Sequence, residues 1–91
     1  MKDVLILTGA GQISMAIARR MGYGKKIVIG DKKIENAENP AKILNNAGFD
    51  ALPFEIDLSS RTSILQLISK AQELGEIAML VNAAGVSPSQ A

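Results

Sequence analysis

The feature that most restricts the fold of this chain is the regular spacing of four short apolar segments. They cover residues 4–7, 27–29, 51–56 and 77–81, and each is too short to be a buried helix. The connections between them are about twenty residues long, whereas a hairpin needs only a few. Such connections join parallel strands through right-handed helical crossovers. The sequence therefore predicts an α/β fold in which helices cover both faces of a parallel sheet.

The connections contain the helical patterns that this arrangement requires. Apolar residues at helical spacing predict a first helix over residues 13–21. Asn39 before Pro40 predicts the start of a second helix, with only a weak helical turn over residues 33–38 before it.

A proline inside the third strand predicts the order of the strands. Pro53 has no N–H group to donate to a neighbour, so its strand is expected at an edge of the sheet. Ser59 or Ser60 then begins an amphipathic third helix that leads into the fourth strand. The strand order 3-2-1-4 satisfies these conditions. It makes residues 1–91 a single domain with the three layers of a Rossmann-like fold, helix, sheet and helix.

Composition narrows the functions that are open to the chain. Its 91 residues are 47% hydrophobic, which fits one small globular domain. A net charge of +1 provides no field that would attract nucleic acid or an anionic membrane. Cysteine and histidine are both absent, so no metal site is expected and the commonest general base is missing. The first apolar run is too short for a signal peptide or a membrane span, which predicts a cytoplasmic protein.

The turn after the first strand follows the pattern G-x-G-x-x-G except at its last position. Gly9 allows the tight turn, Gly11 allows a pyrophosphate to approach the backbone, and Gln12 and Ile13 open a helix whose N–H groups attract anions. The third glycine of the pattern serves close packing of helix on strand, and Ser14 is nearly as small. Its hydroxyl can bond back to the preceding turn or face the phosphates. The stretch predicts a dinucleotide-binding turn, with an ordinary strand-to-helix turn as the alternative.

The next two strands end in carboxylates. Asp31 lies about 20 residues after Gly9, the spacing of a carboxylate that binds the adenosine ribose. Such a group favours NAD and repels the additional phosphate of NADP, although Lys32 partly offsets that preference. Asp57 and Leu58 follow the third strand and can provide a carboxylate for the adenine amino group and an apolar wall for its ring.

Small residues follow the fourth strand, in the order Asn82, Ala83, Ala84 and Gly85, and they let a cofactor lie against the backbone. Each strand end taken alone has a purely structural explanation, such as a solvated turn, a helix cap or close packing. Their occurrence at four successive strand ends indicates a nucleotide-binding domain.

These motifs resemble those of the short-chain dehydrogenases/reductases over residues 3–88. The stretch Thr8-Gly9-Ala10-Gly11 looks like the family's T-G turn, and Asp57-Leu58 looks like its adenine-contacting pair. The stretch Asn82-Ala83-Ala84-Gly85 looks like the N-N-A-G motif, with Ala83 in place of the second asparagine. The resemblance implies an NAD(P)-dependent oxidoreductase, with NAD as the expected cofactor and NADP possible. The usual glycines at positions 13 and 15 are replaced by Ile13 and Met15, a departure seen in atypical members.

The resemblance also implies catalytic groups that the sequence lacks. The family's Tyr-x-x-x-Lys pair is absent, because the single tyrosine, Tyr23, has Ile27 where the lysine would stand. Relative to the family the chain is therefore expected to be the cofactor-binding half, truncated after the fourth strand, with no catalytic residue and no activity alone. Tyr23 is interpreted as structural. The exposed fourth strand, residues 77–81, predicts a homo-oligomer.

Two alternative functions stay open at this point. One is a non-enzymatic module that binds nucleotides or other proteins, since the fold alone does not define function. The other is a fragment of a methyltransferase that uses S-adenosylmethionine, a class that also has a glycine turn and acidic residues after the second and third strands. The Thr8-Gly9 turn and the small residues at 82–85 argue against the methyltransferase.

Overall fold

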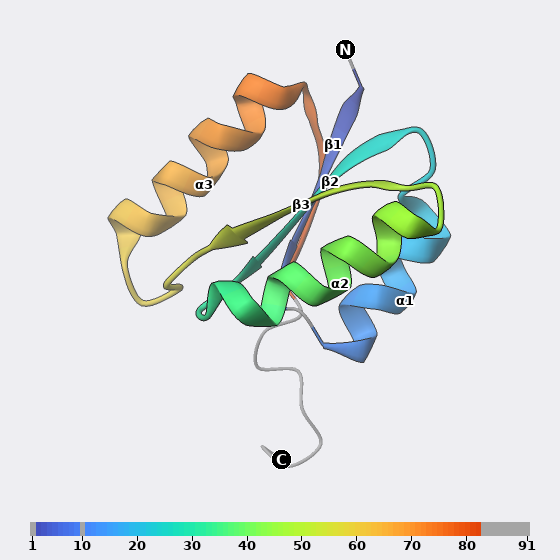
Figure 1. The fold of residues 1–91 in the computed structure, drawn as a ribbon. Helices are drawn as coiled ribbons and strands as arrows, with labels where there is room; N and C mark the ends of the chain where they lie inside the picture. The colour runs from blue at the N-terminus through green and yellow to red at the C-terminus, as the bar shows by residue number, and fades with distance from the viewer. Residues whose placement is uncertain (1, 10, 83–91) are drawn as a thin grey trace.

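The computed structural model describes residues 2–9 and 11–82 as one parallel sheet with three helices. In chain order the elements are β1 (Asp3–Thr8), α1 (Gln12–Met21), β2 (Lys25–Asp31), α2 (Ile34–Asn46), β3 (Asp50–Glu55), α3 (Arg61–Leu74) and β4 (Ile77–Asn82). The strands lie in the order β3-β2-β1-β4 (Figure 1). The predicted α/β fold and strand order are thus confirmed.

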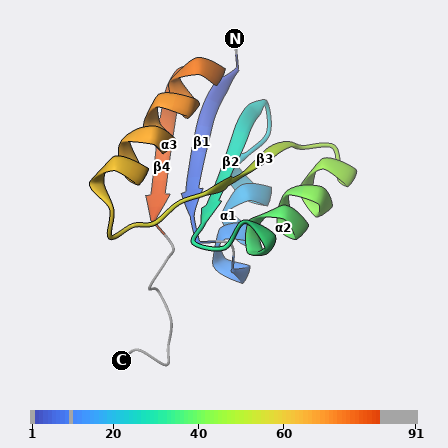
Figure 2. The ribbon, with the colours of Figure 1, turned by 60° about the vertical axis from the view of Figure 1, so that its left-hand side comes forward.

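Helices cover the two faces of the sheet, with α1 and α2 on one side and α3 on the other (Figures 1 and 2). Alternate residues of β1 serve the two cores. Leu5 and Leu7 pack in the core beneath α1 and α2, whereas Val4 and Ile6 pack in the core beneath α3. All four are fully buried. This double burial explains why the first strand is a continuous apolar run rather than an alternating one.

The two edges of the sheet differ in chemistry. Pro53 lies on the outer strand β3, opposite Ile29 of β2, so its missing N–H disrupts no second ladder. At the other edge of the described sheet, β4 pairs with β1 and carries no proline or charge between Ile77 and Asn82. The edge position predicted from Pro53 is confirmed.

The predicted start of the second helix is wrong. Instead of beginning at Asn39-Pro40, α2 begins at Ile34 and contains Pro40 in its interior. The physical reason is tertiary packing, because the helix buries a stripe at the spacing i, i+3, i+4, i+7: Ala37, Pro40, Ala41 and Leu44. Burial of this stripe offsets the backbone hydrogen bond that a proline cannot make.

The start of the third helix agrees with the sequence. Ser60 is the N-cap of α3, and its hydroxyl oxygen accepts a hydrogen bond of 3.2 Å from the backbone N–H of Ser63. None of the helices in the described ranges is long and apolar enough to cross a membrane.

Candidate functional site

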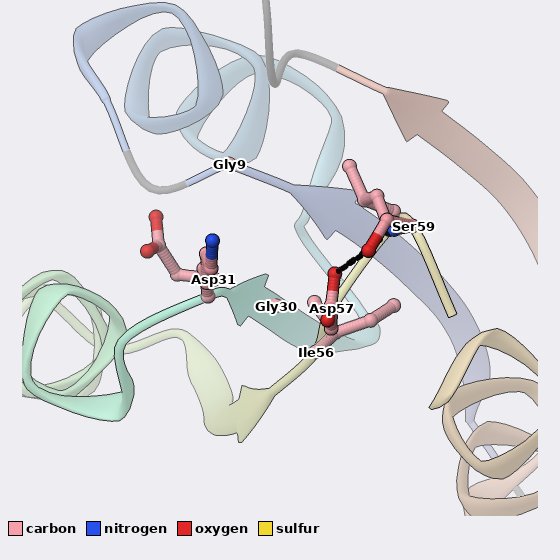
Figure 3. A pocket seen from close by; sticks show the side chains of 8 residues that line it. Gly9, Gly30, Asp31, Ile56, Asp57 and Ser59 are labelled. Carbon is pink, nitrogen blue, oxygen red and sulfur yellow. Dashed lines mark hydrogen bonds between the residues drawn. The ribbon is translucent and has the colours of Figure 1, made fainter. Parts of the chain in front are cut away.

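The carboxyl ends of β1, β2 and β3 surround a cavity of about 310 Å³. It is lined by Gly9, Gly30, Asp31, Lys32, Ile56, Asp57, Leu58 and Ser59 (Figure 3). Five of the residues that the sequence singles out therefore meet at one place, although they come from three different turns. The parallel sheet brings them together, because every strand ends at this edge.

The glycine turn after β1 has the backbone geometry that its sequence predicts. Gly9 has φ of 95°, a conformation that side chains rarely tolerate, and its N–H donates a 2.6 Å hydrogen bond to the Gly30 carbonyl. Gly11 is the N-cap of α1. Because glycine has no side chain, no side-chain hydrogen bond caps this end of the helix in the described chain. The first N–H groups of a helix have no partner inside the helix and carry a partial positive charge. This end of α1 can therefore receive an anion.

Three further residues of the turn lie beside the cavity rather than in its lining. Gln12 contributes, with Gly11, to an open groove along α1, and Ile13 is exposed in the first helical turn. Ser14 is 1% exposed, and its hydroxyl donates a hydrogen bond to the carbonyl of Gly9. The sequence left two roles for this hydroxyl, a bond back to the turn or a contact with the phosphates, and the structure shows the bond back to the turn. Ala10 lies outside the described residues.

Asp31 closes β2 at one side of the cavity, with Gly30 between it and Asp57 (Figure 3). Its Oδ1 accepts hydrogen bonds from the backbone N–H of Lys33 at 3.1 Å and from the side-chain amide of Asn36 at 3.3 Å. These two donors orient the carboxylate at the start of α2. Sequence reasoning missed Asn36, whose only signal is a side-chain amide five residues after the aspartate.

Asp57 is held by a turn of its own after β3. Its Oδ1 accepts hydrogen bonds from the Ser59 hydroxyl at 2.6 Å and from the Ser59 backbone N–H at 2.9 Å (Figure 3). These bonds, with a smaller contribution from the charge of Lys32, lower the pKa of Asp57 below its ordinary value. The carboxylate is therefore charged at neutral pH. Asp57 does not cap α3, a role that belongs to Ser60.

The end of β4 is tied to the end of β1. The hydroxyl of Thr8, which is 3% exposed, donates a 2.8 Å hydrogen bond to Oδ1 of Asn82. Asn82 lines a smaller, neighbouring cavity of about 190 Å³, and Thr8 and Leu58 also line it. The other predicted residues of this motif, Ala83, Ala84 and Gly85, lie outside the described residues.

Tyr23 lies beyond the C-terminal end of α1, at the opposite end of that helix from Gly11. The residue is 74% exposed, and its ring packs on Phe49 with the ring centroids 4.8 Å apart. This contact supports the structural interpretation of the tyrosine. In residues 2–9 and 11–82, no group of three or more carboxylates, histidines or cysteines is arranged to hold a metal ion.

A parallel sheet in this order, with a glycine turn after its first strand and a carboxylate after its second, is the arrangement that α/β dinucleotide-binding domains use. The family model for short chain dehydrogenases matches residues 2–91. The chain therefore belongs to the short-chain dehydrogenase/reductase family.

Relatives and solved structures agree with this assignment. A short-chain dehydrogenase/reductase of Alternaria brassicicola is 36% identical over 87 residues, covering 96% of this chain and 32% of the relative. A 7alpha-hydroxysteroid dehydrogenase of Bacteroides fragilis is 36% identical over 85 residues, covering 90% of this chain and 33% of the relative. A crystal structure of an actinorhodin polyketide ketoreductase variant with NADPH has a TM-score of 0.84 at 32% identity, over 92% of this chain and 33% of that one. The chain thus spans about a third of the length of these proteins.

Proposed function

We propose that this chain binds a nicotinamide adenine dinucleotide at the carboxyl edge of its sheet, as the cofactor-binding part of a short-chain oxidoreductase. The observation that carries the proposal is the convergence of Gly9, Asp31 and Asp57 on one cavity, from three separate turns. Two similar structures support it. The ketoreductase variant is described with NADPH. A putative D-mannonate oxidoreductase of Haemophilus influenza, which is similar in fold, is described with bound NAD.

The residues fit the parts of such a cofactor. The open N-terminus of α1, at Gly11, Gln12 and Ile13, would receive the diphosphate, because among the described atoms a Cβ built on Gly11 meets nothing within 4 Å. Asp31 would accept hydrogen bonds from the ribose hydroxyls, with Lys32 beside it. In this proposal NAD is preferred over NADP.

The base would lie at the other side of the same cavity. Asp57 is charged and held by Ser59, so it can accept a hydrogen bond from the adenine amino group. Leu58 is 40% exposed and offers an apolar surface to the ring. Asn82, with residues 83–85, would face the part of the cofactor that extends toward the nicotinamide, which supplies the hydride when it is bound.

Calorimetric titration of the chain with NADH and with S-adenosylmethionine tests the proposal. We expect binding of NADH and none of S-adenosylmethionine. Binding of S-adenosylmethionine alone would identify a methyltransferase fragment. Binding of neither would favour a module that acts through protein contacts.

We also expect no hydride transfer by these 91 residues alone. Carbonyl reduction needs a proton donor at the substrate oxygen, and the sequence has no Tyr-x-x-x-Lys pair, histidine or cysteine. Asp31 and Asp57 lie where the adenosine would bind, and Tyr23 lies at the far end of α1. The check is the absorbance of the reduced nicotinamide with a panel of aldehydes and ketones. Turnover that survives purification and is lost in Gly11→Asp would contradict this expectation.

A further expectation is that the chain self-associates through β4. The strand forms an edge of the described sheet, and Leu80 is 57% exposed on it. Exposed apolar edges without charge or proline pair with other strands. Light scattering at tens of micromolar should give the mass of a dimer or larger species, and Leu80→Lys should reduce it to a monomer. Leu65→Lys, at an equally exposed leucine of α3, is the control, and monomeric wild-type protein would contradict the idea.

A further inference from the structure

We propose that Ser14 is a positioning residue that holds the glycine turn in the conformation that binds phosphate. This inference rests on the proposed dinucleotide site and adds a role for the residue that departs from the glycine pattern. The hydroxyl of Ser14 acts through the carbonyl of Gly9, which it binds, and does not contact the ligand.

The burial of the Ser14 side chain excludes a direct contact between its hydroxyl and a cofactor. The residue is 1% exposed and lies in the first turn of α1. The hydroxyl proton is used in the bond to the carbonyl of Gly9, five residues earlier in the chain. A buried hydroxyl with this partner can influence a ligand only through the turn that it holds.

Gly9 is a residue of the turn that needs such a support. Glycine has more backbone freedom than any other residue, and here it must keep φ at 95°. Its N–H is held by the Gly30 carbonyl at 2.6 Å, and its own carbonyl is held by Ser14. The two bonds attach Gly9 both to β2 and to α1, so Gly9 is held in place before a ligand arrives. A site that is already ordered loses less entropy on binding.

The serine also satisfies the requirement for a small residue at this position. A larger side chain would have to displace its neighbours, because position 14 is already without free surface. A glycine or an alanine would fit but would leave the Gly9 carbonyl without this donor. Serine is thus a small residue that adds a bond across the turn.

The test compares ligands with and without a diphosphate. Ser14→Ala keeps a helix-forming residue of suitable size and removes only the hydroxyl. We expect it to weaken binding of ADP-ribose by about threefold to tenfold, the effect of one hydrogen bond, and to change binding of adenosine by less than about twofold. Both affinities are measured by NMR titration of the 91-residue chain. The thiol of Ser14→Cys is a weaker donor of similar size, so this variant should bind ADP-ribose with an affinity between those of the wild type and Ser14→Ala.

The control is Ser60→Ala, which removes the hydroxyl that caps α3 outside the glycine turn. It should lower thermal stability while leaving the ratio of the two affinities unchanged. Equal losses for ADP-ribose and adenosine in Ser14→Ala, or no loss, would overturn the role of Ser14 alone. Wild-type protein that binds neither ligand would contradict the proposed function as well.

Discussion

Replacement of Gly11 by aspartate is expected to abolish NADH binding and to leave the fold at least as stable as before. Gly11 has φ of −78°, which any residue can adopt, and a Cβ there meets nothing within 4 Å among the described atoms. Aspartate is a favoured N-cap and its charge suits the N-terminus of α1. The expected gain in the free energy of unfolding is a few tenths to about 1 kcal/mol.

The carboxylate introduced by Gly11→Asp would also weaken binding of the ligand. It would occupy the place proposed for the diphosphate, and it would take the free N–H groups of α1 that the phosphates need. Two like charges about 4 Å apart near a protein surface repel by about 4 kcal/mol, so we expect affinity for NADH to fall by about 100-fold or more. Calorimetric titration and thermal unfolding measure the two effects in one preparation.

The matched control is Gly11→Asn, which has the same shape and also caps helices but carries no charge. It should keep NADH binding to within about tenfold of the wild type, because only steric crowding and competition for the N–H groups remain. If Gly11→Asp bound NADH as well as Gly11→Asn does, the diphosphate would not lie at the start of α1.

The strand order was predictable because short local features of the sequence indicate whether a strand lies inside the sheet or at its edge. The continuous apolar run at residues 4–7 requires a strand with both faces covered, and Pro53 requires an edge. The start of α2 was not predictable in the same way. Pro40 is a common signal for the first turn of a helix, whereas the evidence for helix before it depends on Ala37 packing in the core, which only tertiary contacts reveal.

The candidate site shows the same division. The residues that face the cavity carry local signals, because a glycine or a carboxylate follows three successive strands, although each alone also fits an ordinary turn. The residues that hold them do not. Asn36 and Ser59 are ordinary polar residues at the start of a helix or in a turn, and their importance appears only when their hydrogen bonds to Asp31 and Asp57 are seen. Ser14 is intermediate between these two groups. Its departure from the glycine pattern is visible in the sequence, but its hydrogen bond to the Gly9 carbonyl is not.

The second large effect concerns Asp31 and the choice between NAD and NADP. In the wild-type chain we expect NADH to bind about tenfold or more tightly than NADPH, because a phosphate on the ribose would meet the carboxylate at close range. Lys32 lines the cavity but is an exposed charge on a flexible side chain, so it offsets this repulsion only in part. Asp31→Ala should weaken NADH by about tenfold, through loss of charged hydrogen bonds to the ribose, and should bring the two affinities close together.

Asp31 also serves the fold, since its Oδ1 accepts hydrogen bonds from Lys33 and Asn36 at the start of α2. Asp31→Asn separates the two roles, because its amide oxygen can still accept these bonds but carries no charge. We expect Asp31→Asn to remove most of the discrimination against NADPH, read as the ratio of the two dissociation constants, while thermal unfolding stays close to that of the wild type. Glu38→Gln removes an equal charge from an exposed position further along α2 and should leave the ratio unchanged, because solvent and salt screen it from the site. A ratio that is the same in Asp31→Asn and in the wild type would show that the ribose does not lie against Asp31.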